Sequence, residues 1–68
     1  MRDFLKAARV SRGMTMRDAA EAIGISASHY SMIETGDRDP SGKVAVRLCA
    51  VLGVEMELLY AVVHSAGN

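Results

Sequence analysis

The chain has 68 residues, of which half are apolar and 4% are aromatic, and its acidic and basic side chains balance to a formal net charge of zero. A chain of this length buries only about 60% of its unfolded surface, which leaves room for one small core and excludes a second domain. Few aromatic residues and a single proline favour an all-α fold over a disordered or β-rich chain.

The cysteine count and the hydropathy pattern exclude several further classes. The single cysteine, Cys49, excludes an intramolecular disulfide and a cysteine cluster for zinc, and its apolar neighbours predict a buried thiol. His64 has no ligand partner nearby in the sequence, so we expect no metal and no cofactor. The sequence shows no signal-peptide pattern and no uninterrupted apolar run of about 18 residues, which predicts a cytoplasmic protein without membrane contact.

A first helix is predicted over residues 3–11, because apolar side chains recur there at helical spacing, and Gly13 ends it. Arg2 and Lys6 are expected to face solvent. The side chains expected to face the core are Phe4, Leu5 and Ala8.

The second predicted helix, over residues 16–23, has clear start and stop signals. Thr15 can cap its first turn while Asp18 returns the hydrogen bond, and Gly24 suits the left-handed conformation that ends a helix. The side chains expected to face inward are Ala19, Ala20 and Ile23.

The third predicted helix, over residues 27–35, follows after only Ile25 and Ser26, and Ser26 can cap it. So short a turn fixes the angle between the two helices, which is the pattern of a helix-turn-helix. Tyr30 and Ile33 are expected to face inward, with the Tyr30 hydroxyl reaching water or phosphate. The outer side is short-chained and nearly uncharged, and consists of Ala27, Ser28, Ser31 and Met32.

A polar loop then leads into a fourth predicted helix over residues 42–52. Pro40 disfavours helix at the residue before it, Ser41 can cap the new helix, and Gly53 ends it. The apolar stripe of this helix is typical of a core face and consists of Val44, Leu48, Val51 and Leu52.

The fifth predicted helix runs from residue 55 to about 63 and is more apolar than one face of a small monomer needs. A fraying tail is expected over residues 64–68, so the domain is predicted to occupy residues 1–63. Apolar surface patches often mark an interface, and here we expect pairing across a twofold axis. The candidate interface residues are Tyr60, Val62 and Val63.

Over nearly its whole length the chain resembles the phage repressor and Cro type of DNA-binding domain, the XRE-like helix-turn-helix family. The shared motifs are Leu5-Lys6-Ala7-Ala8-Arg9, Gly13-Met14-Thr15, the run from Ala19 to Ser26, the run from Ser31 to Gly36, Pro40-Ser41, and the run from Leu48 to Val54. The resemblance implies a compact five-helix, repressor-like all-α domain in which the second and third helices form the helix-turn-helix.

The resemblance also implies roles for single residues. The start of the third helix would enter the major groove of DNA, so Ala27, Ser28 and Met32 would face bases, with Ser31 or His29 assisting. His29 alternatively serves as an ordinary capping or surface residue. A largely buried ion pair between Arg9 and Glu34 would tie the first helix to the end of the third.

Phosphate contacts are implied near the starts of the second and fourth helices, which straddle the DNA backbone in this family. The candidates are Met16 through its backbone N–H, Arg12, Arg17, Arg38, Ser41 and Lys43. Two positions depart from the family pattern: Met16 stands where many members carry Gln, and Ala27 where many carry Gln, Lys or Arg. Ala27 can contact a thymine methyl group but cannot form a bidentate hydrogen bond, so base discrimination is expected to be modest.

These features predict a sequence-specific DNA-binding transcriptional regulator, a repressor or a phage or mobile-element control protein, that binds a palindromic operator in double-stranded DNA as a homodimer. An enzyme is not expected, because no nucleophile, base and orienting group can be assembled from these residues. The alternative is an antitoxin-like or adaptor module that uses the same fold to bind a protein partner, which the zero net charge favours.

Overall fold

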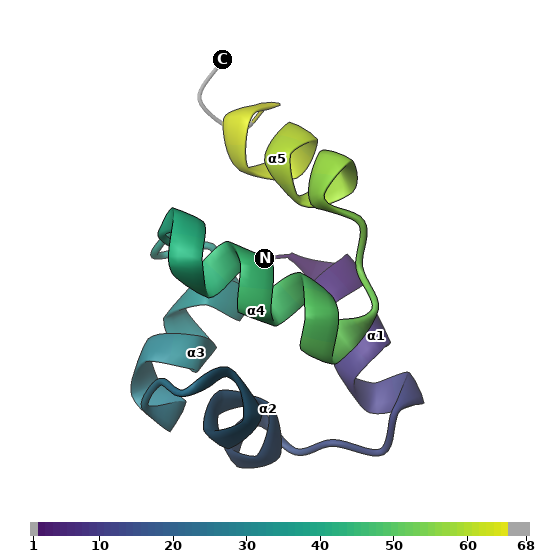
Figure 1. The fold of residues 1–68 in the computed structure, drawn as a ribbon, viewed down its shortest axis with the longest axis vertical. Helices are drawn as coiled ribbons and strands as arrows, with labels where there is room; N and C mark the ends of the chain where they lie inside the picture. Colours follow the sequence, from purple (N-terminus) through teal and green to yellow (C-terminus); the bar gives the residue numbers. More distant parts are fainter. Residues whose placement is uncertain (1, 66–68) are drawn as a thin grey trace.

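A computed structural model describes residues 2–65, and over that range the chain consists of five α-helices without a strand (Figure 1). The helices are α1 (Asp3–Ser11), α2 (Met16–Ile23), α3 (Ala27–Thr35), α4 (Gly42–Leu52) and α5 (Met56–Ser65). The all-α prediction is confirmed, and the first four helices have the predicted bounds. The fifth begins one residue later and continues through residues 64 and 65, which the sequence had suggested as tail; residues 66–68 of that tail lie outside the described range.

Side-chain caps and glycines set the helix ends. The Thr15 hydroxyl accepts from the Asp18 N–H and the Asp18 carboxylate accepts from the Thr15 N–H, both at 3.0 Å, which completes the capping box at α2. The hydrogen bond that the Thr15 N–H donates to this carboxylate, and with it the Thr15 side chain, lowers the pKa of Asp18. Ser26 and Ser41 cap α3 and α4 through their hydroxyls alone, which accept from the His29 and Val44 N–H groups, and Gly24 ends α2 with a φ of 91°, a conformation that other residues rarely adopt.

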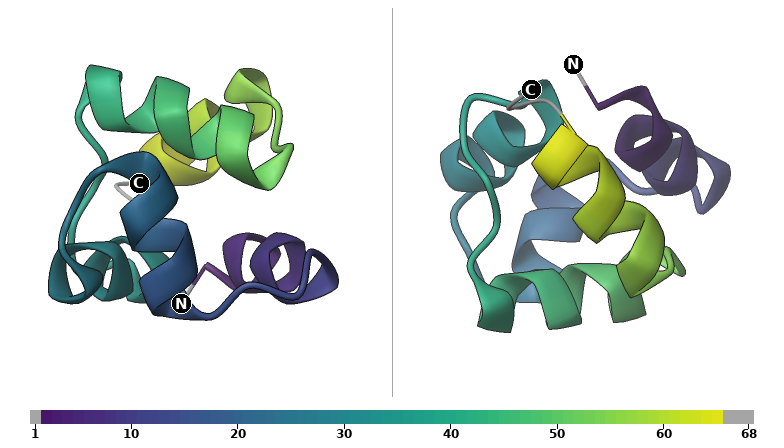
Figure 2. Two further views of the ribbon diagram at one scale, coloured as in Figure 1. Left: turned by 60° about the horizontal axis from the view of Figure 1, so that its bottom comes forward. Right: turned by 90° about the horizontal axis from the view of Figure 1, so that it is seen from above.

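The core draws on all five helices, with α4 crossing the middle of the molecule, α2 and α3 on one side of it and α5 on the other (Figure 1). Viewed from above, α1 and α3 lie at opposite sides with α5 between them (Figure 2). Cys49 is buried as predicted, and burial raises the pKa of its thiol. The buried apolar residues are Leu5, Ala19, Ala20, Ile23, Tyr30, Ile33, Ala45, Leu48, Cys49, Leu52 and Leu59.

The core contains a buried ion pair between α1 and α3. Arg9 donates from Nε to Glu34 Oε2 at 2.9 Å and from its terminal nitrogen to Oε1 at 3.0 Å, and a third hydrogen bond of 2.8 Å reaches the Met14 carbonyl. Glu34 is fully buried and Arg9 is 7% exposed. Burial raises the pKa of Glu34, but the hydrogen bonds and the charge of Arg9 outweigh it, so this pKa lies below its usual value.

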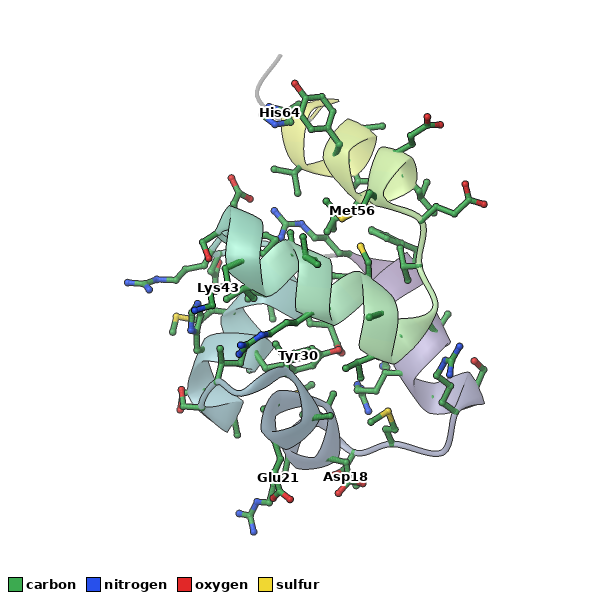
Figure 3. The ribbon with its side chains drawn as sticks, viewed as in Figure 1. Asp18, Glu21, Tyr30, Lys43, Met56 and His64 are labelled. Carbon is green, nitrogen blue, oxygen red and sulfur yellow. The ribbon has the colours of Figure 1, made fainter. Side chains whose placement is uncertain are left out.

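Two side chains lie deeper than the sequence suggested. Tyr30 faces inward as expected but is fully buried, so its hydroxyl does not reach the surface, and its ring lies beneath α4 in the centre of the molecule (Figure 3). Its hydroxyl interacts electrostatically with Arg9 and Glu34 but forms no hydrogen bond of ordinary geometry, and burial raises its pKa. Arg2, expected to face solvent, is only 8% exposed, because its guanidinium donates to backbone carbonyls.

The Arg9–Glu34 pair generates a stability prediction. Replacing Glu34 by Gln leaves the Arg9 charge buried without its partner, so we expect the free energy of unfolding at pH 7 to fall by about 3–5 kcal/mol. Urea unfolding followed by circular dichroism measures this loss. The matched control is Glu21→Gln, which removes an exposed carboxylate from α2 and should change the unfolding free energy little.

The same pair predicts how the loss depends on pH. Because the folded-state pKa of Glu34 is depressed, its contribution is present above the ordinary value of 4.5 and is lost as the pH falls through the folded-state value. The difference between the native chain and Glu34→Gln should therefore shrink in acid. A difference that stays constant from neutral pH into acid would contradict this role for the carboxylate.

Candidate nucleic-acid interface

The turn between α2 and α3 is fixed by hydrogen bonds within the turn and by one hydrogen bond from α4. The Gly24 and Ile25 N–H groups both donate to the Ala20 carbonyl, at 2.8 and 3.0 Å. From α4, the Arg47 guanidinium donates to the Ile23 carbonyl at 3.4 Å and would lie 3.1 Å from a Cβ placed on Gly24. No local sequence pattern predicts this role of Arg47, because the carbonyl that it reaches lies 24 residues away.

The outer side of α3 carries small side chains at its start. Ala27 and Ser28 are exposed, whereas His29, Ser31 and Met32 are partly buried. The first turn contains no acidic residue, and the Ser26 hydroxyl is engaged by the His29 N–H. A helix start of this kind offers a hydroxyl and apolar groups to a partner without presenting a negative charge.

Basic side chains lie on the first turns of the helices beside α3. Arg17 on α2 and Lys43 on α4 are both exposed, and Figure 3 places Lys43 on the same side of the molecule as α3. Met16 stands at the first position of α2, where its side chain packs against the core. Asp18 and Glu21 point outward from α2, so this helix carries two exposed acids beside its one basic residue, Arg17 (Figure 3).

Arg12 lies apart from the other phosphate candidates. Its Nε donates to the Leu52 carbonyl at 3.0 Å, and its guanidinium covers Gly53 at the end of α4. Lys43 lies on the first turn of α4, and a helix of 11 residues is about 16 Å long. The structure therefore places Arg12 at the C-terminal end of α4, where it satisfies a terminal carbonyl.

The loop between α3 and α4 contains Arg38 between two acids. The Asp37 carboxylate accepts from the Thr35 hydroxyl at 3.2 Å, and the Asp39 carboxylate pairs with Arg2. Arg38 itself is exposed. Ser41, the other candidate in this segment, uses its hydroxyl to cap α4 through the Val44 N–H.

An apolar groove lies between the start of α4 and α5, with a volume of about 240 Å³. Tyr60 is 66% exposed and its ring lies 4.0 Å from that of His64, between centroids, whereas Val62 and Val63 are partly buried. The groove is lined by Pro40, Gly42, Ala45, Met56, Leu59, Tyr60, Val63 and His64.

Residues 2–65 contain neither a metal-binding cluster nor a membrane-spanning helix. No group of three or more His, Cys, Asp or Glu side chains in this range is placed to hold a metal ion. None of the five helices in the same range is long and apolar enough to cross a membrane.

Comparison with known proteins places this geometry in a family. A helix-turn-helix family model matches residues 5–59. The uncharacterised HTH-type transcriptional regulator YqaF of Bacillus subtilis is 35% identical over 60 residues, which cover 88% of this chain and 79% of that protein. The uncharacterised HTH-type transcriptional regulator MJ0272 of Methanocaldococcus jannaschii is 33% identical over 60 residues, covering 88% and 91% of the two chains.

A third relative is longer. The transcriptional regulator ClgR of Mycobacterium tuberculosis is 30% identical over 57 residues, which cover 84% of this chain but only 51% of ClgR. No solved structure gives a significant match. The family match spans most of α1, all of α2 to α4 with the capped α2–α3 unit, and the first turn of α5. The chain therefore belongs to the XRE-type helix-turn-helix family of DNA-binding domains, and not to an enzyme family.

Proposed function

We propose that this chain is a sequence-specific transcriptional regulator that represses transcription, in a phage or other mobile element, by binding a palindromic operator as a twofold dimer. The observation that carries the proposal is the α2–α3 unit, whose capped turn presents an acid-free, exposed helix start. YqaF and MJ0272, which align with this chain over most of their length, are named as transcriptional regulators. These names support the regulatory part of the proposal.

The first turn of α3 enters the major groove in this mechanism. Ser28 offers a hydroxyl that donates to or accepts from a base edge, while Ala27 and Met32 make apolar contact with thymine methyl groups. Ser31 and His29 are only partly exposed and assist at the edge of the contact. Neither Ala27 nor Ser28, the exposed side chains at the start of α3, can form a bidentate hydrogen bond with a base. Each base contact therefore contributes weakly, and discrimination between DNA sequences is modest.

Arg17 and Lys43 contact phosphates on either side of the groove, together with the backbone N–H of Met16 at the start of α2. The chain as a whole is neutral, so attraction to DNA depends on where these charges lie rather than on their number. Arg38 and Ser41 extend the same contact through the α3–α4 loop.

Dimerisation through α5 places two copies of α3 about one duplex turn, roughly 34 Å, apart. Three large apolar side chains of this helix are substantially exposed, which is costly for a monomer in water. They are Met56 at 46%, Leu58 at 50% and Tyr60 at 66% exposure.

The division between base and phosphate contacts predicts two different mutant phenotypes. Ser28→Ala should relax base preference, by a factor of about ten at one operator position, and leave the salt dependence of binding unchanged. Lys43→Ala should weaken binding to all sequences alike and lower the salt slope by about one. Fluorescence anisotropy with the preferred duplex, selected from a random pool, and with single-base variants of it measures both.

Wild-type binding to random duplex DNA at low salt is the reference for these variants. Equal effects of Ser28→Ala and Lys43→Ala on base preference would contradict the assignment of α3 as the base-contacting helix. Absence of any binding by the native chain would remove the regulator function altogether.

If the chain dimerises through α5 as proposed, a charged side chain introduced on this helix should separate the two copies. Tyr60→Glu should shift the sedimentation coefficient to that of a monomer and weaken operator binding at least tenfold, since each half-site would then bind alone. Val10→Glu is the matched control, because Val10 is 56% exposed on α1 and receives the same charge. A native chain that sediments as a monomer with and without its operator would rule out the twofold arrangement.

A second candidate function follows from the groove between α4 and α5. An antitoxin-like or adaptor module would use this apolar groove to hold a segment of another protein, with the fold retained and DNA binding lost. The low-salt duplex titration separates the two functions, because a module of this kind binds no duplex even where electrostatic attraction is strongest.

A further inference from the structure

Arg2 connects the N-terminus to the end of α3 and to the loop that follows. Its backbone N–H donates to the Glu34 carbonyl at 2.9 Å. One guanidinium nitrogen donates to the carbonyls of Ile33 and Arg38, each at 3.0 Å, and the other pairs with the Asp39 carboxylate. Arg2 is 8% exposed, so these contacts hold its charge at a fixed place.

The α3–α4 loop, to which Arg2 binds, carries one basic residue between two acidic residues. Asp37 and Asp39 flank Arg38, and both acids lie next to a residue that the proposed function assigns to a phosphate. Asp37 is engaged by the Thr35 hydroxyl at 3.2 Å, but a hydroxyl leaves its charge in place. Asp39 is 59% exposed, and within residues 2–65 its salt bridge is to the guanidinium of Arg2. Without Arg2 this exposed carboxylate would repel a DNA strand.

We propose that Arg2 is a positioning residue for DNA binding, which neutralises Asp39 and fixes the α3–α4 loop so that Arg38 and the first turn of α4 approach a phosphate. The inference rests on the proposed function, because it assigns a further residue to the same surface. Arg2 itself points into the protein and acts through the loop.

Two properties of the contact favour this role over stability alone. The acceptors lie in the last turn of α3 and along the loop, so a single side chain fixes where the base-contacting helix ends and how the chain leaves it. Its partner Asp39 is exposed rather than buried. Because the Asp39 end of the pair lies in solvent, loss of the Arg2 charge leaves an unpaired carboxylate at the surface that a phosphate would approach.

The experiment uses the full chain with Arg2→Met, which keeps the aliphatic stem and removes the donors and the charge. We expect affinity for every duplex to fall about tenfold, with base preference unchanged, because an uncompensated Asp39 opposes phosphate binding. Adding Asp39→Asn to Arg2→Met should restore most of the affinity. A purely structural role gives no such rescue, because the carbonyls of Ile33 and Arg38 remain without their donor.

Asp39→Asn alone tests the inference without removing Arg2. Arg2 keeps its two carbonyl acceptors, and the loop gains a net positive charge, so we expect affinity for all duplexes to rise about threefold and the salt slope to steepen. The matched control is Glu57→Gln, which removes one exposed carboxylate from α5 and should leave the affinity unchanged.

Circular dichroism first establishes that each variant is folded. If Arg2→Met is unfolded, the comparison of Asp39→Asn with Glu57→Gln decides: a rise confined to Asp39→Asn supports the role, and equal affinities overturn it. Unchanged binding by folded Arg2→Met, or a loss that Asp39→Asn does not restore, also overturns it. Each of these outcomes would overturn the role of Arg2 while the native chain still binds DNA. If the native chain binds no DNA, the proposed function itself is refuted.

Discussion

The buried ion pair between Arg9 and Glu34 is the contact on which the placement of α3 depends. It joins the last turn of the first helix to the end of the third, and the charge of each partner is tolerated in the core only because the other is there. The third donor group of Arg9 holds the Met14 carbonyl at the entry to α2. One side chain thus fixes both ends of the helix-turn-helix unit relative to α1.

Other arginines also connect parts of the chain that lie far apart in the sequence. Four of the eight basic side chains donate to backbone carbonyls, and they are Arg2, Arg9, Arg12 and Arg47. Arg2 and Arg9 are buried, whereas Arg12 and Arg47 are exposed, as are Lys6, Arg17, Arg38 and Lys43. Two of the eight positive charges are therefore withdrawn from the surface. Because arginine side chains secure the turn and the loop, the outward charges beside them are held at defined places, which matters more in a neutral domain than in a basic one.

The two surfaces of the molecule differ in chemistry. The start of α3 is polar, small and free of acid, and it lies between basic groups on α2 and α4. At the far side of α4, the groove against α5 is apolar, and Leu58 and Tyr60 project large apolar groups into solvent. The polar surface at α3 and the apolar surface at α5 therefore lie on different sides of α4 (Figure 1).

The sequence by itself determined the helices and their ends, because caps such as Thr15 and left-handed glycines such as Gly24 act through neighbours within a few residues. Family motifs indicated the Arg9–Glu34 contact and the base-facing positions of α3, although those positions remain predictions. Tertiary structure alone decided where the long side chains of Arg2, Arg12 and Arg47 go, since each reaches a carbonyl more than 20 residues away. No local periodicity encodes such a partner. The same packing buried Tyr30 completely, because α4 covers a ring whose depth the α3 pattern alone left undecided.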